Sequence, residues 1–410
     1  MSDADRTGAA PVTSRERVGE LDVLRGFALL GVLLVHLVTW PAAPVLATDA
    51  EWAALTAAPA DAITQFLVNW LFYDKANTLF AFLFGVGFWV QMQRMRARGG
   101  DFERLYVRRL TVLLVIGVIN MLAIWQWDIL GLYALAGFAL FALRGAGDRT
   151  LLIGGLVLAL AGRPVSDYLF ELSGLTTASL DLAFSEAEIL ARQETATWWS
   201  AYSDFARLNW LEWLTGGVIV GWFFYALGRF MIGAYVARKG WIQRAGELLP
   251  RYRFWLLVCL PLGLIGEFVA TALSLETFSA LEPLHDWKPV IHFASVPLLA
   301  VGYLCLVVLI YHTRASWMVR LFGPVGRMAL TNYVVQGAFI SLLLYDFWPG
   351  LGLLGDVGPA TLVACGLGFF VLQTVVSQLW LSLFAYGPLE WVWRALTYGK
   401  APRMLRAGGQ

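Results

Sequence analysis

The sequence predicts an all-α protein, a polytopic bundle of about ten membrane-spanning helices with both termini in the cytoplasm. Of its 410 residues, 59% are hydrophobic and only 14% are charged, whereas a soluble domain carries about 25% charged residues. Apolar runs also recur at the length of about 20 residues that crosses a bilayer as a helix. Finally, the loops between these runs alternate between basic and acidic, which gives the bundle a direction.

The apolar runs define ten expected spans. They cover residues 21–41, 76–93, 108–125, 129–145, 150–164, 216–236, 254–273, 289–311, 328–346 and 360–385. Two shorter stretches, 62–73 and 387–400, are typical of helices that lie at the membrane surface, the second with Trp391 and Trp393 as anchors. Residues 1–18 are polar, so we expect a disordered cytoplasmic tail, followed by a single transmembrane domain over 19–400.

Loop charges set the orientation. The loop 94–109 contains six arginines, and the loop 237–253 is also basic, whereas 42–62 contains no Lys or Arg. The positive-inside rule places the basic loops in the cytoplasm, which predicts a multi-pass protein of the inner or plasma membrane. The acidic, tryptophan-rich segment 165–214 then becomes an outer loop, for which we expect amphipathic helices on the membrane surface.

Arg25 and His36 are the most informative pair in the chain. Both lie inside the first apolar run, where ionisable side chains are costly and seldom without a function. Eleven residues correspond to about three helical turns plus 20°, so the two side chains share one helix face, about 16 Å apart along the axis. The orientation puts Arg25 near the cytoplasm and His36 near the outer surface.

Further polar residues fall in the outer halves of other spans. We expect one outward-facing cavity to be lined by His36, Lys75, Asn120, Asp128, Glu267 and His292. Each also has a purely structural interpretation. His36 or Glu267 can form an interhelical hydrogen bond, Lys75 can extend toward lipid headgroups, and Asp128 can cap a helix.

The same residue types support two functions. A carboxylate next to His36 would make it a general base, and Arg25 suits a phosphate-bearing donor, unless Arg25 only pairs with Asp22. This combination predicts transfer of a group across the membrane. A proton-coupled transporter or exporter of a small metabolite, with His36 and Glu267 as its proton relay, uses the same residue types.

Several motifs resemble those of the bacterial YeiB family of integral membrane proteins. They are LDVLRGFALLGVLLVH (21–36), KANTLFAFLFGVG (75–87), YVRRLTVLLVIGVINMLAIWQWDILGLYALAG (106–137), GRMALTNYVVQ (326–336) and GPLEWVWRALTYG (387–399). That family is similar to the broader transmembrane acyltransferases, which include heparan-alpha-glucosaminide N-acetyltransferase and bacterial sugar O-acetylases. The O-acetylases carry an Arg followed, after ten residues, by a His that their activity requires, and Arg25 and His36 match this spacing.

The resemblance implies an acyltransferase whose acyl-coenzyme A co-substrate, such as acetyl-CoA, enters from the cytoplasm. The acyl group would reach a glycan or another small-molecule acceptor outside, with His36 as general base, oriented by Asp128 or paired with Asn120. In GRMALTNYVVQ, Arg327 would join Arg25 on the donor phosphates, and Asn332 and Gln336 would form a polar wall. Their alternative role is interhelical hydrogen bonding.

Other functions lack support in the sequence. A net charge of +1 gives no basis for binding nucleic acid. The four histidines have no metal-ligand spacing, so we expect neither a metal site nor a tightly bound cofactor. Membrane lipids are the expected surroundings of the bundle.

The sequence departs from its nearer relatives at two positions, and this yields a prediction. YeiB proteins typically have Asn where His36 stands and His where Asn120 stands, so the two residue types are exchanged here. We therefore expect His36 and Asn120 to face each other as one hydrogen-bonding pair. A structure that places the two side chains more than about 8 Å apart, too far for one bridging water, would contradict this.

Overall fold

The computed structural model describes residues 18–41, 49–97, 101–125, 127–174, 203, 218–275, 278–345 and 350–406. In these residues the protein is helical, and β-structure is limited to one isolated bridge between Phe384 and Leu405. Seven helices are long and apolar enough to cross a membrane, or eight when one bent pair is counted as a single span. The chain is therefore a helical membrane protein.

Each of the ten expected spans coincides with a helical segment. The long helices are α2 (Gly19–Thr39), α5 (Lys75–Ala97), α6 (Phe102–Ala123), α8 (Gly155–Ser173), α11 (Val218–Arg238), α12 (Leu249–Ser274), α13 (Lys288–Tyr311), α16 (Ala329–Leu344) and α17 (Pro359–Leu383). A π-helical turn, η2 (Thr150–Gly154), leads into α8. Three of the ten are not simple apolar spans. Helix α5 is too polar to count as a membrane span by its composition, and α7 (Leu130–Ala142) is shorter than a span. Helix α16 forms a bent pair with the helical segment Ser316–Arg327.

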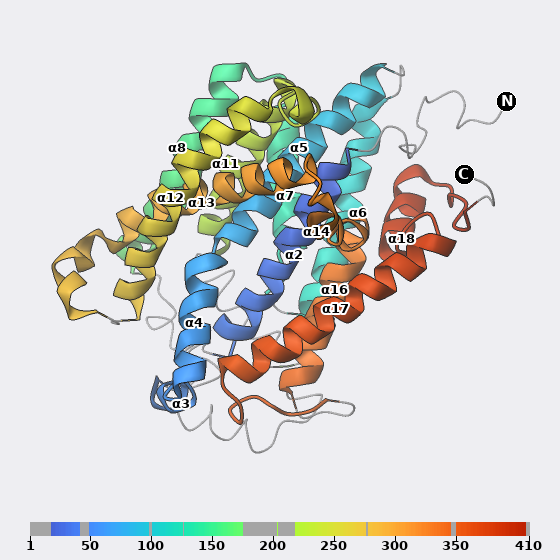
Figure 1. The fold of residues 1–410 in the computed structure, drawn as a ribbon. Helices are drawn as coiled ribbons and strands as arrows, with labels where there is room; N and C mark the ends of the chain where they lie inside the picture. The colour runs from blue at the N-terminus through green and yellow to red at the C-terminus, as the bar shows by residue number, and fades with distance from the viewer. Residues whose placement is uncertain are drawn as a thin grey trace.

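Helix α2 is the centre of the bundle (Figure 1). Thirteen of its 21 residues are buried, and it packs against α5, α13, α16 and α17 and against the short helix α15 (Gly323–Arg327). Because α2 is apolar around its whole circumference, it is stable only when other helices surround it. Its residues belong to both of the large apolar clusters, so it joins the two halves of the core.

A sharp bend of 84° separates α15 from α16. At the bend, Gly326 lies against the Asp22 carbonyl and Gly26 lies against the Phe322 carbonyl, so the two backbones touch. Helix α18 (Pro388–Tyr398) supports the bend through Glu390, which accepts hydrogen bonds from the N–H groups of Leu330 and Thr331, at 2.7 and 3.1 Å. The carboxylate thereby satisfies donors that a helix start leaves without intrahelical partners.

Two helices differ from the expected boundaries. The stretch expected at the membrane surface is α4 (Pro59–Leu71), which stands alongside the lower half of α2 in Figure 1, with Val68 packed on α2. Helix α8 continues past Pro164, the expected end of a span, to Ser173. Membrane helices tolerate an internal proline when neighbouring helices satisfy the freed carbonyl groups.

Other expectations concern residues that the structure does not describe. Residues 1–17 of the expected tail and most of the expected outer loop 165–214 lie outside the described residues. The tryptophans expected to anchor α18 at the membrane surface are hydrogen-bonded within the protein. The indole N–H groups of Trp391 and Trp393 donate to the carbonyls of Pro402 and Arg109, at 2.7 and 2.9 Å.

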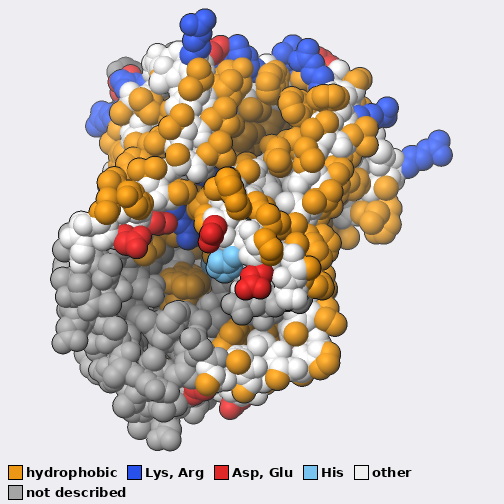
Figure 2. All heavy atoms as spheres, turned by 90° about the vertical axis from the view of Figure 1, so that its left-hand side faces the viewer, with side chains coloured by type: hydrophobic (Ala, Val, Ile, Leu, Met, Phe, Trp, Pro, Cys, Tyr) orange, Lys and Arg blue, Asp and Glu red, His pale blue; other side chains and the backbone are white. Residues whose placement is uncertain are grey.

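Charge is unevenly distributed over the surface. Figure 2 shows Lys and Arg side chains gathered at one end of the molecule, next to a broad band of hydrophobic side chains. This basic end includes the last turns of α5, with Arg94 and Arg96, and of α11, with Arg238. Such a distribution is typical of a membrane protein with one preferred orientation.

The glycine contact at the bend makes a stability prediction. Gly326→Ala would push a methyl group into the Asp22 carbonyl and separate α15 from α2. We expect a loss of about 1–3 kcal/mol in the free energy of unfolding, as for other overpacked sites. The matched control is Gly368→Ala in α17, where a methyl group meets nothing within 4 Å. Denaturant unfolding in detergent would contradict the contact if the two variants were equally stable.

Candidate functional site

Two cavities lined by described residues carry polar side chains. The arginine cavity, of about 300 Å³, is lined by Arg25, Arg94, Arg109, Arg327 and Arg394. The histidine cavity, of about 380 Å³, is lined by His36, Asp74 and Arg163, by the aromatic side chains of Tyr73, Trp127 and Trp222, and by three amides, Gln65, Asn69 and Asn77. Tyr333 lines both cavities.

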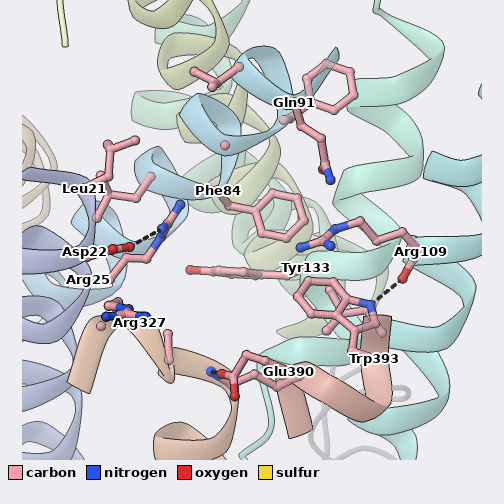
Figure 3. Close-up of a pocket in the computed structure, with 18 of the residues that line it drawn as sticks. Leu21, Asp22, Arg25, Phe84, Gln91, Arg109, Tyr133, Arg327, Glu390 and Trp393 are labelled. Carbon is pink, nitrogen blue, oxygen red and sulfur yellow. Dashed lines mark hydrogen bonds and ion pairs between the residues drawn. The ribbon is translucent and has the colours of Figure 1, made fainter. Parts of the chain in front are cut away.

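The arginine cavity lies toward the basic end of the molecule. Figure 3 shows Arg25, Arg109 and Arg327 converging on one space from three helices, with Glu390 and Trp393 at its edge. Arg25 donates a hydrogen bond to Asp22 at 3.2 Å, so the local ion pair and the exposure to the cavity coexist. Arg109 stacks 3.5 Å above the Trp393 ring, which fixes its guanidinium group.

This cavity has the chemistry of a polyanion site. Among the described residues that line it, there are five arginines and two carboxylates, Asp22 and Glu390, and burial raises the pKa of the Glu390 carboxyl. Arginine binds phosphate oxygens through paired N–H groups, and its charge is permanent. The rings of Phe84, Tyr106 and Tyr133 supply apolar surface beside these cations.

His36 occupies the histidine cavity. Its imidazole ring lies against Trp125, with 5.2 Å between the ring centres. Within the described part of the chain, neither ring nitrogen has a hydrogen-bond partner, and Asp128 accepts its hydrogen bonds from Asn120 and Gly131. The ring nitrogens are therefore available to a molecule bound in the cavity.

Asp74 is the buried centre of an ionic network beside this cavity. It is 4% exposed and occupies the break between α4 and α5 with a φ of 62°, in the left-handed region. Its Oδ2 atom lies 3.1 Å from Nε2 of His292 and 3.5 Å from Nη1 of Arg163. Such strained, buried polar positions are typical of functional sites.

The network continues on the far side of His292. Its Nδ1 atom lies 3.2 Å from Oε1 of Glu267, and Glu267 forms an ion pair with Lys75, both side chains being 1% exposed. Ser295 also donates a hydrogen bond to Glu267, at 2.5 Å. The chain Lys75–Glu267–His292–Asp74–Arg163 therefore links α5, α12, α13 and α8.

Helix α11 forms hydrogen bonds with the backbone of Asp74 and with the neighbouring Thr78. The hydroxyl of Tyr225 donates to the Asp74 carbonyl at 2.9 Å. Arg229 donates to the Thr78 hydroxyl at 2.8 Å and to the Ala159 carbonyl at 3.2 Å. These bonds hold the helix break in place.

Asn120 and Asp128 form a separate pair. The Asn120 amide donates to Oδ1 of Asp128 at 2.8 Å, and the Gly131 N–H donates to Oδ2 at 2.9 Å. Asp128 thus caps the start of α7. Of the six residues expected to line one outer cavity, only His36 lines the histidine cavity. Lys75, Glu267 and His292 belong to the ionic network of Asp74.

Asn120 remains connected to His36 indirectly. The backbone N–H of Trp125 donates to the backbone carbonyl of Asn120 at 2.8 Å, and the indole ring of Trp125 lies against His36. The direct His36–Asn120 contact stays a prediction.

Asn332 and Gln336 do not form a wall of the arginine cavity. The Asn332 amide donates to the Ser377 hydroxyl, and the Gln336 amide donates to the Gln373 side-chain carbonyl, both at 3.0 Å. Both side chains are buried between α16 and α17. They have the interhelical role that was the alternative, because the bend at Met328 turns this face of α16 toward α17.

Comparison with known proteins supplies the family. A family model described as "Protein of unknown function (DUF418)" matches residues 236–400. The chain is 32% identical to the "Uncharacterized protein YxaH" of Bacillus subtilis, over 95% of this chain and 96% of that protein. It is 30% identical to the "Uncharacterized protein YeiB" of Escherichia coli, over 96% and 98% of the two chains. The chain belongs to the YeiB family.

Several site residues of this YeiB-family protein were not predicted. Arg229 lies in the middle of the expected span 216–236, and a charge at that depth was a usable signal. Arg163 was equally visible at the end of an expected span. Asp74 and Tyr333 carried no comparable signal, because only the packing of distant helices makes their positions special.

The buried ion pair of this YeiB-family protein makes a second stability prediction. Lys75→Met leaves the Glu267 carboxylate without its main counter-charge, and breaking a buried pair costs about 3–5 kcal/mol. We expect a large drop in the unfolding midpoint in detergent, partly restored by adding Glu267→Gln.

The matched control is Lys239→Met, which removes a half-exposed partner of Asp148 and should leave the midpoint near that of the wild type. Equal midpoints for the two lysine variants would contradict the structural role of Lys75.

Proposed function

We propose that this protein is a membrane acyltransferase that moves an acyl group from a cytoplasmic acyl-CoA to an extracytoplasmic glycan or another envelope acceptor. The supporting observation is the pair of cavities that share Tyr333, one lined by five arginines and the other by His36, Asp74 and three amides. Under the positive-inside rule, the basic end and both termini face the cytoplasm of the cell that carries the protein in its inner or plasma membrane. The arginine cavity then receives the donor and the histidine cavity the acceptor.

The donor's phosphates would bind the arginines. Arg25 and Arg327 lie on one side of the cavity, and Arg109, stacked on Trp393, lies on the other (Figure 3). A thioester arm extending from this position toward Tyr333 runs along α2, the helix whose one face carries both Arg25 and His36. The acyl carbon would thereby approach Tyr333, which lines both cavities.

His36 would act on the acceptor. A neutral imidazole nitrogen with no other hydrogen-bond partner can take the proton of an attacking hydroxyl or amine. Asp74 and Arg163 line the same cavity and would hold the acceptor's polar groups, together with the three amides. Asn120 and Asp128 would act indirectly, because they fix the turn that presses Trp125 against His36.

A proton-coupled transporter or exporter is the second candidate, and one observation favours it. The buried chain Glu267–His292–Asp74 connects titratable groups at hydrogen-bond distance, as a proton relay requires. A transporter would move the intact small molecule from one cavity to the other. An acyltransferase would transfer only the acyl group.

The test uses inside-out membrane vesicles from cells that produce the protein, given acetyl-CoA labelled in the acetyl group. We expect label in the glycan or lipid fraction. His36→Ala should lower this transfer at least about 100-fold, the smallest loss typical of a general base.

The matched control is His285→Ala, an exposed histidine in η5 (Ser279–Trp287), away from both cavities, which should transfer label at the wild-type rate. Full transfer by folded His36→Ala would exclude the general-base role. Label that stays small and soluble inside the vesicles would instead support the transporter.

A further inference from the structure

Tyr333 is shared by the two cavities. It lies on α16 after the bend, is 4% exposed, and lines the arginine cavity and the histidine cavity alike. The start of α7 faces it: Ile129 lines the histidine cavity, and Leu130 lines the arginine cavity. Tyr333 and the start of α7 therefore line both cavities between which an acyl group would pass.

The Tyr333 hydroxyl has a defined orientation. Its oxygen accepts a hydrogen bond from the Ile129 N–H at 3.1 Å, one of the donors that the start of α7 leaves without an intrahelical partner. The Asp128 carboxylate fixes this turn, because it accepts a hydrogen bond from the Gly131 N–H at the start of α7. No acceptor for the phenolic proton is found among the residues that the structure describes.

This arrangement makes the phenol a prepared hydrogen-bond donor. An N–H group that donates to a hydroxyl oxygen polarises the O–H bond, which strengthens it as a donor. The positive end of the α7 dipole acts in the same direction. A donor that is buried, oriented and without an acceptor is what a developing oxyanion requires.

We infer that Tyr333 is a catalytic residue, whose hydroxyl donates a hydrogen bond to the acyl oxygen as it becomes an oxyanion. This inference rests on the proposed acyl transfer. The acceptor hydroxyl, in the histidine cavity, forms a C–O bond to the thioester carbon and gives its proton to His36. The carbonyl electron pair moves onto the oxygen, where Tyr333 stabilises it.

Collapse of this tetrahedral intermediate completes the reaction. The carbonyl reforms, the C–S bond breaks, and the thiolate leaves toward the arginine cavity. The proton held by His36 returns to that thiolate, so the products are the ester and free coenzyme A. Tyr333 keeps its own proton throughout, which is why its hydroxyl needs no base beside it.

The test is Tyr333→Phe in the labelled acetyl-CoA vesicle assay. Removing one oxyanion donor lowers kcat by about 100- to 1,000-fold in other enzymes, and we expect that loss here. The KM for acetyl-CoA should stay near the wild-type value, because the phosphate-binding arginines are intact.

Tyr345→Phe is the matched control. Tyr345 directly follows α16, and its hydroxyl also accepts a buried N–H, from Trp40 at 3.1 Å, but it lines neither of the two cavities. Both variants lose the acceptor of one N–H, so we expect similar unfolding midpoints and wild-type transfer only in Tyr345→Phe.

Should Tyr333→Phe fail to fold, 3,5-difluorotyrosine incorporated at position 333 preserves the hydroxyl. Fluorine makes a phenol a stronger acid, so the high-pH limb of the rate profile should move to lower pH if the phenolic proton is required. An unchanged profile would overturn the inference.

The remaining outcomes are distinct. Wild-type transfer with an equally active, folded Tyr333→Phe overturns the oxyanion role and leaves the proposed acyl transfer standing. An inactive wild-type protein overturns the acyl transfer, and the role of Tyr333 with it.

Discussion

The charge balance around Asp74 is the constraint on which the arrangement of the helices depends. An unpaired carboxylate in a low-dielectric interior costs several kcal/mol, so Asp74 and Glu267 are stable there only when cations accompany both. Those cations come from different helices: Lys75 from α5, Arg163 from α8 and Arg229 from α11. The network therefore fixes the positions of these helices relative to α12 and α13.

The histidine cavity follows from this arrangement. The helix break at Asp74 directs α4 along the lower half of α2 and leaves space between α2, α4 and α8, which the cavity occupies. His36 on α2 faces that space, while Lys75 and Glu267 are turned away from it and neutralise each other. The groups that stabilise the wall are thus separate from the group available to a substrate.

The arginine cavity differs from the network around Asp74 in its ratio of cations to carboxylates. Among the described lining residues, five arginines share one space with two carboxylates, and such an excess of one sign of charge attracts ions of the other sign. Stacking of Arg109 on Trp393 and the hydrogen bonds of Glu390 to the start of α16 hold α18 in place beside the cavity. Proteins depart from favourable local patterns chiefly at functional sites, and this cluster is such a departure. The network surrounds each buried carboxylate with cations, whereas the described lining of the arginine cavity holds more arginines than carboxylates.

The sequence alone predicted the long helices and much of one cavity. Apolar length located the long helices, because crossing a bilayer requires about 20 apolar residues. It did not locate short helices such as α3 (Asp49–Leu55), α14 (Ser316–Arg320) and α15 (Gly323–Arg327). The spacing of Arg25 and His36 placed both on one face of α2, and the structure finds them at two cavities along that helix. Arg25 and Arg327 were also expected together, and they meet in the arginine cavity.

Only the tertiary structure decided which polar residues meet. Hydropathy gives the depth of a residue in the membrane but not the direction in which it faces. Six residues at similar depth therefore resembled one site. In the structure, Lys75, Glu267 and His292 belong to the ionic network of Asp74, whereas Asn120 and Asp128 bond to each other. Asp74 and Tyr333 owe their importance to neighbours more than 50 residues away, Arg163 and His292 for the first and Ile129 for the second. Packing between distant helices sets such contacts, and no local pattern in the chain encodes them.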